Sequence, residues 1–300
     1  MVCIVTAYPG HCRCEDVIRG TFTLNQREMV MIYKPQDRVI CEKLLKSALN
    51  KGWSEKPINE LVLLVGKHFL GTRYVFKTLE TKGPEDLVIN LRRMDCFTFL
   101  ENSVVLAKTI KRGQTRFEDF AAALQETRYR LGTISGYSSR LHYFCDWLHN
   151  SEQISLVKNI TKELGGEPFS KVVNFMTRNR NKYPALKQGE SYAEMQEVES
   201  RISDECHDYI PKQTLRDCEQ RIQDGDLIAI TTTIDGLDVV HVGLAVFVGK
   251  RLHLLHASTT GRRVIISPRT LYGYLTGRKI RSGIVVARFQ GSNSSILLMG

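Results

Sequence analysis

The chain has 300 residues, 42% of them hydrophobic and 25% charged, and this ordinary globular composition allows a sizeable core without disulfide or metal staples. Its 42 lysine and arginine residues exceed its 32 aspartate and glutamate residues, so the formal net charge of +10 favours polyanionic partners. No run approaches the length of apolar sequence that a membrane-spanning helix needs. The interleaving of arginine and aromatic residues that is typical of nucleic-acid binding is also missing.

Residues 1–35 show little periodic pattern, and we treat them as a segment that precedes a single domain of residues 36–300. The start, "MVCIVTAYPGHCRCED", has a short apolar run but neither a basic region nor a long apolar core, so a full signal peptide is not evident. The eight cysteines are too scattered for a disulfide scaffold or a zinc knuckle, although Cys206 and Cys218 could pair in a secreted protein.

Helical spacing of apolar residues begins near residue 36. "KPQDRVICEKLLKSALNKGW" predicts a helix that ends at Gly52, and "PINELVLLVGKHFLG" predicts a second helix that starts at Pro57. The short strand-like run "EDLVINL" leads to a third helix over residues 96–111. "FEDFAAALQETRYRLG" and "SYAEMQEVESRI" predict further helices within a mixed, polar region at about residues 115–220, which we interpret as helical insertions.

After Gly225 the pattern changes to β-branched runs. "DLIAITTTI" and "DVVHVGLAVFV" flank Asp235-Gly236-Leu237, which predicts a β-hairpin, and "RLHLLHAS", "RRVIIS" and "SGIVVARF" predict three more strands. Helices that precede an antiparallel meander indicate an α+β fold.

Cys96, in "NLRRMDCFTFLEN", stands where an extended run ends and a helix begins. The thiolate is the nucleophilic form of cysteine, and the dipole and N–H groups of a helix N-terminus stabilise it. Asp95 is placed to cap this helix, and His241, His253 and His256 on the following strands are candidate bases. Taken alone, Cys96 is more typical of a core residue. A cysteine at a helix start, followed by a histidine on one strand and a polar residue on its neighbour, is typical of a papain-like thiol hydrolase.

Five segments in this order, "GTRYV", "MDCFTFLEN", "GDLIAI", "HVGLAV" and "LLHAS", resemble the NlpC-type cell-wall peptidases. These enzymes are compact, circularised relatives of papain that cleave bacterial peptidoglycan. "NLRRMDCFTFLEN", "SRLHYFCDWLHN" and "GDLIAITTTIDGLDVVHVGLA" are most similar to the N-acetylmuramoyl-L-alanine amidase-like branch, and the resemblance covers about residues 35 to 290. It implies a papain-like fold with helices packed on a central antiparallel sheet of about five to six strands.

The resemblance also implies roles for single residues. Cys96 matches the nucleophile and Asp95 the acidic residue before it. His241 matches the general base, and His256 the third member that orients the imidazole. Tyr74 matches a tyrosine whose hydroxyl helps to line the oxyanion site.

Two positions depart from the family pattern. Many relatives have proline where this chain has Arg73, and the common spacing of the two histidines would select His253 instead of His256. His253 and His256 are an odd number of residues apart, so they should face opposite sides of a strand, and one of them can point at His241. We prefer His256, because "HAS" is the matching motif.

The implied reaction is amide hydrolysis through a thioester, without a metal or another cofactor. The implied bond joins N-acetylmuramic acid to L-alanine. Muropeptides carry carboxylates, and Ser139, Arg140 and His142 lie close together in "SSRLHYFCDW", so Arg140 could bind a stem-peptide carboxylate. Alternatively, Arg140 pairs with Asp146 or another acid to brace the fold, and His142 and Asp146 form a helical pair. Arg262 and Arg263 either add positive potential beside the cleft or form a solvated hairpin end.

Two other functions remain open. A γ-D-glutamyl–diamino acid endopeptidase would have the same fold, and a catalytically inactive glycan- or peptide-binding module would need none of the three candidate catalytic residues. We expect a monomer whose partner is peptidoglycan or its muropeptide fragments. Peptidoglycan lies outside the cytoplasm, so we expect a periplasmic or secreted protein.

Overall fold

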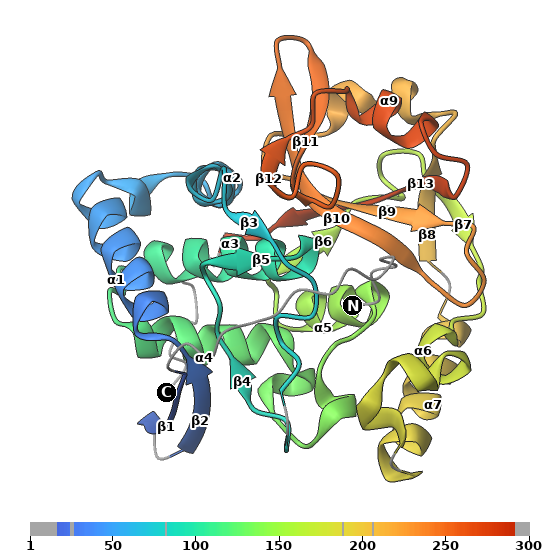
Figure 1. The fold of residues 1–300 in the computed structure, drawn as a ribbon. Helices are drawn as coiled ribbons and strands as arrows, with labels where there is room; N and C mark the ends of the chain where they lie inside the picture. The colour runs from blue at the N-terminus through green and yellow to red at the C-terminus, as the bar shows by residue number, and fades with distance from the viewer. Residues whose placement is uncertain (1–16, 25–26, 82, 188, 206, 292–300) are drawn as a thin grey trace, which may run out of the picture.

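The computed structural model describes residues 17–24, 27–81, 83–187, 189–205 and 207–291 (Figure 1). The initial segment "MVCIVTAYPGHCRCED", where a full signal peptide was not evident, lies outside these residues. So does Cys206, which could pair with Cys218 in a secreted protein. Within the described part of the chain, no helix is both long enough and apolar enough to cross a membrane.

A mixed sheet of ten strands forms the centre of the described structure, in the order β5-β3-β12-β11-β10-β9-β13-β8-β7, with β6 also pairing with β13. In chain order the strands are β3 Arg73–Tyr74, β5 Arg93–Met94, β6 Val157–Asn159, β7 Glu167–Phe169, β8 His207–Pro211, β9 Leu227–Thr232, β10 Val239–Val248, β11 Arg251–Ser258, β12 Arg263–Ile266 and β13 Arg281–Phe289. The pair β3 and β5 is parallel, and the other pairs are antiparallel.

All five strands predicted after Gly225 are present, and they form the antiparallel middle of the sheet. The predicted sheet of five to six strands was too small. Strands β3 and β5 extend one edge, and β6, β7 and β8 from the insertion extend the other. Strands of two or three residues are too short to show an alternating pattern, so the sequence did not reveal most of these additions.

Helices cover both faces of the sheet. Along β10 and β11, Leu244 and Leu255 belong to the core under α2 (Ile58–His68) and α3 (Cys96–Lys111). Ala245 and Leu254, one residue away on each strand, belong to a second core. That core includes residues of α8 (Leu215–Cys218) and α9 (Leu271–Thr276). Because side chains alternate along a strand, the two cores lie on opposite faces, and all six residues of β9 are buried.

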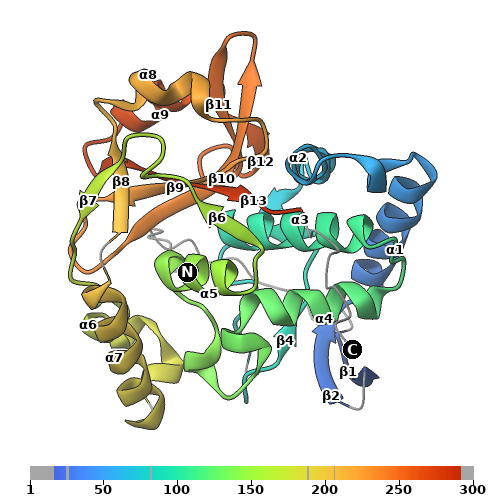
Figure 2. The same cartoon turned by 180° about the vertical axis from the view of Figure 1, so that it is seen from behind.

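The predicted helices are confirmed, with α1 at Pro35–Asn50, α4 at Phe117–Arg128 and α7 at Gly189–Asp204. Helices α1, α3 and α4 pack side by side (Figure 2). Helix α5 (Phe144–Gln153) contacts β6, and α6 (Phe175–Arg178) and α7 lie below the end of the sheet that carries β7 and β8 (Figure 1 and Figure 2). Residues before α1 form an unpredicted hairpin of β1 (Ile18–Leu24) and β2 (Arg27–Tyr33). The expected "EDLVINL" strand, β4 (Leu87–Val88), joins it in a small second sheet.

Gly236 ties the insertion to the predicted hairpin. Its φ of 75° favours glycine, and a β-carbon there would approach the Asn174 side chain to 2.4 Å. The N–H groups of Asn174 and Phe175 both donate to the Gly236 carbonyl, at 3.0 and 2.9 Å. The turn between β9 and β10 therefore anchors the start of α6.

Candidate active site

The N-terminus of α3 is fixed by a reciprocal capping box. Asp95 Oδ1 accepts hydrogen bonds from the N–H groups of Phe97 and Thr98, at 3.1 and 2.9 Å, and Thr98 Oγ1 accepts one from Asp95 N at 2.9 Å. Asp95 is thus the N-cap, as predicted. Cys96 is the first residue of the helix and has no exposed surface.

The two strand histidines from "HVG" and "HAS" contact each other directly. His241 Nε2 of β10 lies 2.5 Å from His256 Nδ1 of β11, and the two rings are nearly perpendicular, at 88°. His253 is directed elsewhere, because its Nδ1 lies 2.8 Å from the carbonyl oxygen of Ser267. The structure therefore brings His256 to His241, as the match of "HAS" to the family motif predicted, and not the alternative His253.

Tyr274 of α9 lies beside the histidine pair and within electrostatic range of the cysteine, and no sequence pattern indicated this. Its ring centroid lies 6.2 Å from that of His241 and 5.3 Å from that of His256. Burial raises the pKa of Tyr274, Arg281 opposes the increase, and Cys96 adds to it, so the thiol lies within electrostatic range of the phenol. Arg281 stacks on the Tyr274 ring, with Cζ 3.7 Å from the centroid.

Both histidines are held in the neutral form at pH 7. Burial lowers the pKa of His241 well below its usual value, and the neighbouring His256 and Arg281 lower it further. Burial and the positive charge of Arg281 lower the pKa of His256 to about 4. His256 Nε2 is buried without a hydrogen-bond partner in the described residues. A neutral imidazole is the form that can accept a proton.

Tyr74 is placed beside the start of α3 by the parallel pairing of β3 with β5. It pairs with Met94, two residues before Cys96, and its N–H donates to the Arg262 carbonyl at 2.9 Å. The Tyr74 side chain is half-buried and packs against the core that contains Cys96.

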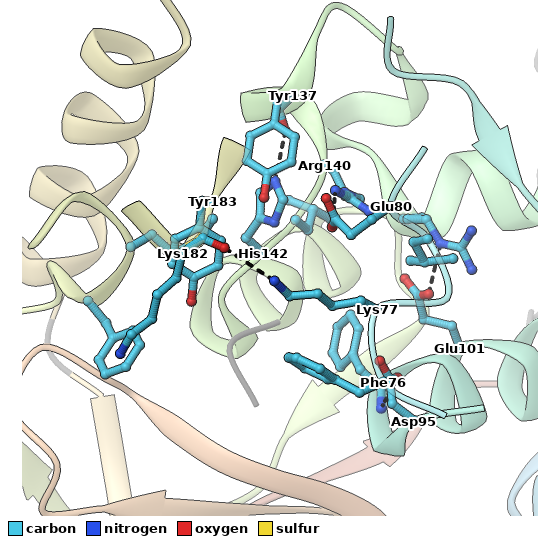
Figure 3. Close-up of a pocket in the computed structure, with 16 residues that line it drawn as sticks. Phe76, Lys77, Glu80, Asp95, Glu101, Tyr137, Arg140, His142, Lys182 and Tyr183 are labelled. Atoms are coloured by element: carbon cyan, nitrogen blue, oxygen red, sulfur yellow. Dashed lines mark hydrogen bonds and ion pairs between the residues drawn. The ribbon is translucent and has the colours of Figure 1, made fainter. Parts of the chain in front are cut away.

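A cavity of about 320 Å³ opens beside the start of α3 (Figure 3). Asp95 and Phe97, the residues on either side of Cys96, line one end of it. Across the cavity, Lys77 Nζ donates to the Lys182 carbonyl at 3.2 Å. The walls combine the aromatic side chains of Phe76, Phe97, Tyr137, Phe175 and Tyr183 with the charged ones of Lys77, Glu80, Asp95, Glu101, Arg128, Arg140 and Lys182.

Two of the three residues predicted to bind substrate, Arg140 and His142, line this cavity. Arg140 forms salt bridges with Glu80 at 3.0 Å and Glu85 at 3.2 Å. Arg140 therefore pairs with other acids, as the alternative interpretation allowed, and not with Asp146, which lies 2.6 Å from Arg130 and 2.8 Å from Arg201. The chain fold brings acids from a distant loop to Arg140, and sequence proximity could not indicate that.

His142 is buried, and its Nε2 lies 2.8 Å from the backbone oxygen of Tyr137. A carbonyl only accepts hydrogen bonds, so His142 carries its proton on Nε2 and presents Nδ1 as an acceptor. Burial lowers the pKa of His142 well below its usual value, and Arg140 adds to this effect. The expected helical pair of His142 with Asp146 is not formed, because His142 precedes α5 and bonds to Tyr137.

Ser139, the third residue predicted to bind substrate, does not line the cavity. Its hydroxyl donates to the Gly136 carbonyl at 2.6 Å and accepts from Ser135 N at 3.1 Å. Ser139 therefore shapes the loop that precedes Arg140.

A buried carboxylate on α7 holds the far wall of the cavity. Glu199 accepts hydrogen bonds from Tyr143 Oη at 2.6 Å and from the N–H groups of Met176 and Thr177, both at 3.1 Å. The Thr177 hydroxyl donates to the same carboxylate. Glu199 thereby satisfies N–H groups in the first turn of α6, whose Phe175 and Met176 face the cavity.

In the described residues, no three histidine, cysteine, aspartate or glutamate side chains are arranged to hold a metal ion. The candidate site thus consists of Cys96, the histidine pair, Tyr74 and Tyr274, with the aromatic cavity at one side.

Comparison with known proteins gives consistent matches. Residues 64–284 match the family model described as AmiA-like, N-acetylmuramoyl-L-alanine amidase-like. A solved N-acetylmuramoyl-L-alanine amidase from Bacteroides uniformis ATCC 8492 is 35% identical, over 78% of this chain and 99% of that chain, with a TM-score of 0.75. A structure from Bacteroides fragilis, whose name proposes a xylanase, is 37% identical over 76% of this chain and 100% of its own, with a TM-score of 0.72.

Protein LPG0564 from Legionella pneumophila shares the fold, with 20% identity over 85% of this chain and 95% of its own and a TM-score of 0.64. No curated protein matches the chain.

Proposed function

The chain belongs to the N-acetylmuramoyl-L-alanine amidase-like family, and we propose that it is a cysteine-dependent hydrolase of bacterial peptidoglycan with an NlpC-type, papain-like fold. The bond cleaved is the amide between N-acetylmuramic acid and L-alanine. The observation that carries the proposal is the 2.5 Å contact between His241 and His256 beside Tyr274, a tyrosine whose pKa Cys96 helps to raise.

In this mechanism His241 is the general base. Its Nε2–H donates to His256 Nδ1, which leaves Nδ1 of His241 to take the proton of the Cys96 thiol. His256 orients the imidazole and stabilises the imidazolium that forms, as the third member of a triad does. Tyr274 and the surrounding apolar side chains keep the pair buried, which supports the neutral starting form.

The Cys96 thiolate attacks the amide carbonyl and forms a tetrahedral intermediate. Asp95 occupies the N–H groups of Phe97 and Thr98, so we assign oxyanion stabilisation to the N–H of Cys96 and to the Tyr74 hydroxyl. Each such donor contributes on the order of 3 kcal/mol. The C–N bond then breaks, and His241 returns its proton to the leaving amine of L-alanine.

Water completes the cycle. It attacks the thioester while His241 accepts one of its protons, the carboxylic acid of the lactyl group is released, and the Cys96 thiol is restored. The cavity holds the part of the muropeptide that adjoins the scissile bond. Its aromatic walls offer stacking surfaces, and His142 Nδ1 accepts a hydrogen bond from an N–H or O–H group.

Digestion of purified muropeptides followed by mass spectrometry tests the proposal, with Cys96→Ala as the inactive control and Cys145→Ala as the matched control on a buried cysteine of α5. We expect release of the intact stem peptide by the wild type and by Cys145→Ala only. Cleavage within the stem would favour the γ-D-glutamyl–diamino acid endopeptidase. Binding of muropeptide without cleavage would favour the inactive binding module.

The substrate also determines the expected location. Peptidoglycan lies outside the cytoplasm, so a hydrolase of intact wall or its fragments acts in the periplasm or after secretion. Fractionation of cells that express the full chain tests this expectation.

A further inference from the structure

Three arginines form one row across the edge of the sheet. Arg263 of β12 pairs with Arg73 of β3, and Arg73 pairs in turn with Arg93 of β5. Residues that pair directly in register project to the same face of a sheet. Neighbouring strands lie about 4.8 Å apart, so the three Cα atoms span about 10 Å.

No internal carboxylate neutralises the exposed part of this arginine row. Arg73 and Arg263 are exposed, and neither forms a salt bridge within the described residues. Like charges directly opposite each other on neighbouring strands destabilise a sheet. An anion bound along the row would remove this repulsion, because guanidinium groups bind oxyanions in a bidentate manner.

The arginine row lies on the sheet face that carries the histidine pair. Arg263 pairs with Ser258, and His256, two residues before Ser258 on the same strand, pairs with Ile265. Side chains two residues apart on a strand share a face, so His256 and the arginines do so too.

The row is also close to the cysteine. Arg93 precedes Cys96 by three residues, which limits the distance between their Cα atoms to about 10 Å. Strands β12, β3 and β5 lie together at the start of α3 (Figure 1).

We propose that the arginine row binds the carboxylates of the stem peptide while the scissile amide lies at Cys96, an inference that rests on the proposed function. The row is within reach of a substrate held at Cys96, so its ligand is a part of that same molecule. An extended peptide rises about 3.4 Å per residue, so the row covers about three residues of stem. Free carboxylates along these residues each meet a guanidinium group.

The test compares Arg73→Gln, Arg263→Gln and the double variant on two substrates: a muropeptide with free stem carboxylates and the same muropeptide with those carboxylates amidated. Arg112→Gln is the matched control, because Arg112 is an exposed arginine at the opposite end of α3. We expect each row substitution to lower kcat/KM on the free-carboxylate substrate about three- to tenfold, through KM. The amidated substrate should be cleaved equally by all variants, and Arg112→Gln should match the wild type on both substrates.

An equal loss on both substrates, or no loss on either, would overturn the proposal. Stronger inhibition by polyphosphate than by the free stem tripeptide would also overturn the proposal, because the arginine row would then bind a phosphate-bearing polymer. If the wild type cleaves neither substrate, the proposed amidase function fails by itself. Calorimetric titration of the Cys96→Ala protein with free and amidated stem tripeptide then tests the row alone, and equal affinity for the two peptides would contradict it.

Discussion

The candidate general base His241 in the reaction centre and His142 in the cavity beside it are both buried, but they have different hydrogen-bond partners. In the cavity, His142 Nε2 lies 2.8 Å from a backbone carbonyl oxygen, which fixes the tautomer. In the reaction centre, His241 Nε2 lies 2.5 Å from a nitrogen of His256, which can donate or accept. Burial lowers the pKa of both His142 and His241 well below the usual value. Burial thus makes each imidazole neutral, and the partner decides whether it can exchange a proton.

The charged groups around the cavity also differ from those around the histidine pair. The cavity wall contains compensated charges, such as Arg140 with Glu80 and Glu85, and Arg128 with Glu101 at 2.9 Å. The histidine pair contacts the ring of Tyr274, on which Arg281 stacks, and in the described residues no carboxylate lies within hydrogen-bond distance of either imidazole. The cavity therefore holds its charged groups in fixed pairs, whereas the histidine pair is neutral and, in the proposed mechanism, moves a proton.

Alanine substitution of His241 and of His142 should show the difference between the reaction centre and the cavity most clearly. His241→Ala should lower kcat about 1,000-fold, because general-base catalysis is lost. His142→Ala should leave kcat within about threefold and raise KM about tenfold, because it removes one hydrogen-bond acceptor from the bound substrate. Steady-state kinetics on a defined muropeptide measures both, and similar losses of kcat in the two variants would contradict the assignment.

Replacement of Glu199 in the cavity wall should lower the free energy of unfolding. Glu199→Ala removes a buried acceptor of four hydrogen bonds, including two from the first turn of α6, and should lower the unfolding free energy by about 3 kcal/mol. Glu199→Gln, which keeps an acceptor oxygen, should lose less. The exposed Glu197→Ala on the same helix should stay within about 0.5 kcal/mol of the wild type in urea unfolding. A loss below about 1 kcal/mol in Glu199→Ala would show that the wall does not depend on this carboxylate.

His256 should matter less than the base that it orients. His256→Ala should lower kcat about 30-fold, or about 2 kcal/mol, and His256→Asn should recover part of the loss, because its amide oxygen can accept from His241 Nε2–H. His253→Ala, on the same strand but bonded to Ser267, is the matched control and should retain full kcat. Full activity of His256→Ala would show that the close imidazole contact has no catalytic role.

Much of the reaction centre could be predicted from the sequence, because its geometry follows from local rules. The cap at Asp95 follows from residue type and position at a helix start. Alternation of side chains along β11 requires that only one of His253 and His256 face His241, and the match of "HAS" to the family motif selected His256. The five long C-terminal strands were likewise visible as β-branched runs. Neither rule assigns a catalytic role, which stays a proposal for Cys96, His241 and His256.

The parts that could not be predicted depend on distant contacts. Tyr274 lies on a six-residue helix without a periodic pattern, and the fold alone brings it to the histidine pair. The acids that pair with Arg140 precede it by 60 and 55 residues, so proximity in sequence could suggest Asp146 but could not identify Glu80 and Glu85. The arginine row depends on β3 and β5, whose two residues each are too few to show a pattern, so the sequence did not indicate their pairing with each other and with β12.

The smallest predicted effect is on the pH dependence of stability. The pKa of His256 is lowered from 6.5 to about 4 by burial and Arg281, so between these values the unfolded chain binds a proton that the native protein does not. Stability should therefore fall as the pH is lowered from about 6.5 towards 4, and the neutral form contributes fully above this window. In His256→Asn this part of the fall is absent, so the loss of unfolding free energy between pH 7 and pH 5 should be smaller than in the wild type by about 1 to 2 kcal/mol.

Urea unfolding at both pH values measures the difference, with His149→Asn, which removes an exposed histidine of α5, as the control. An equal loss in His256→Asn and the wild type would mean that His256 is as easily protonated in the native state as in the unfolded chain. The neutral pair that distinguishes the reaction centre from the cavity would then not exist.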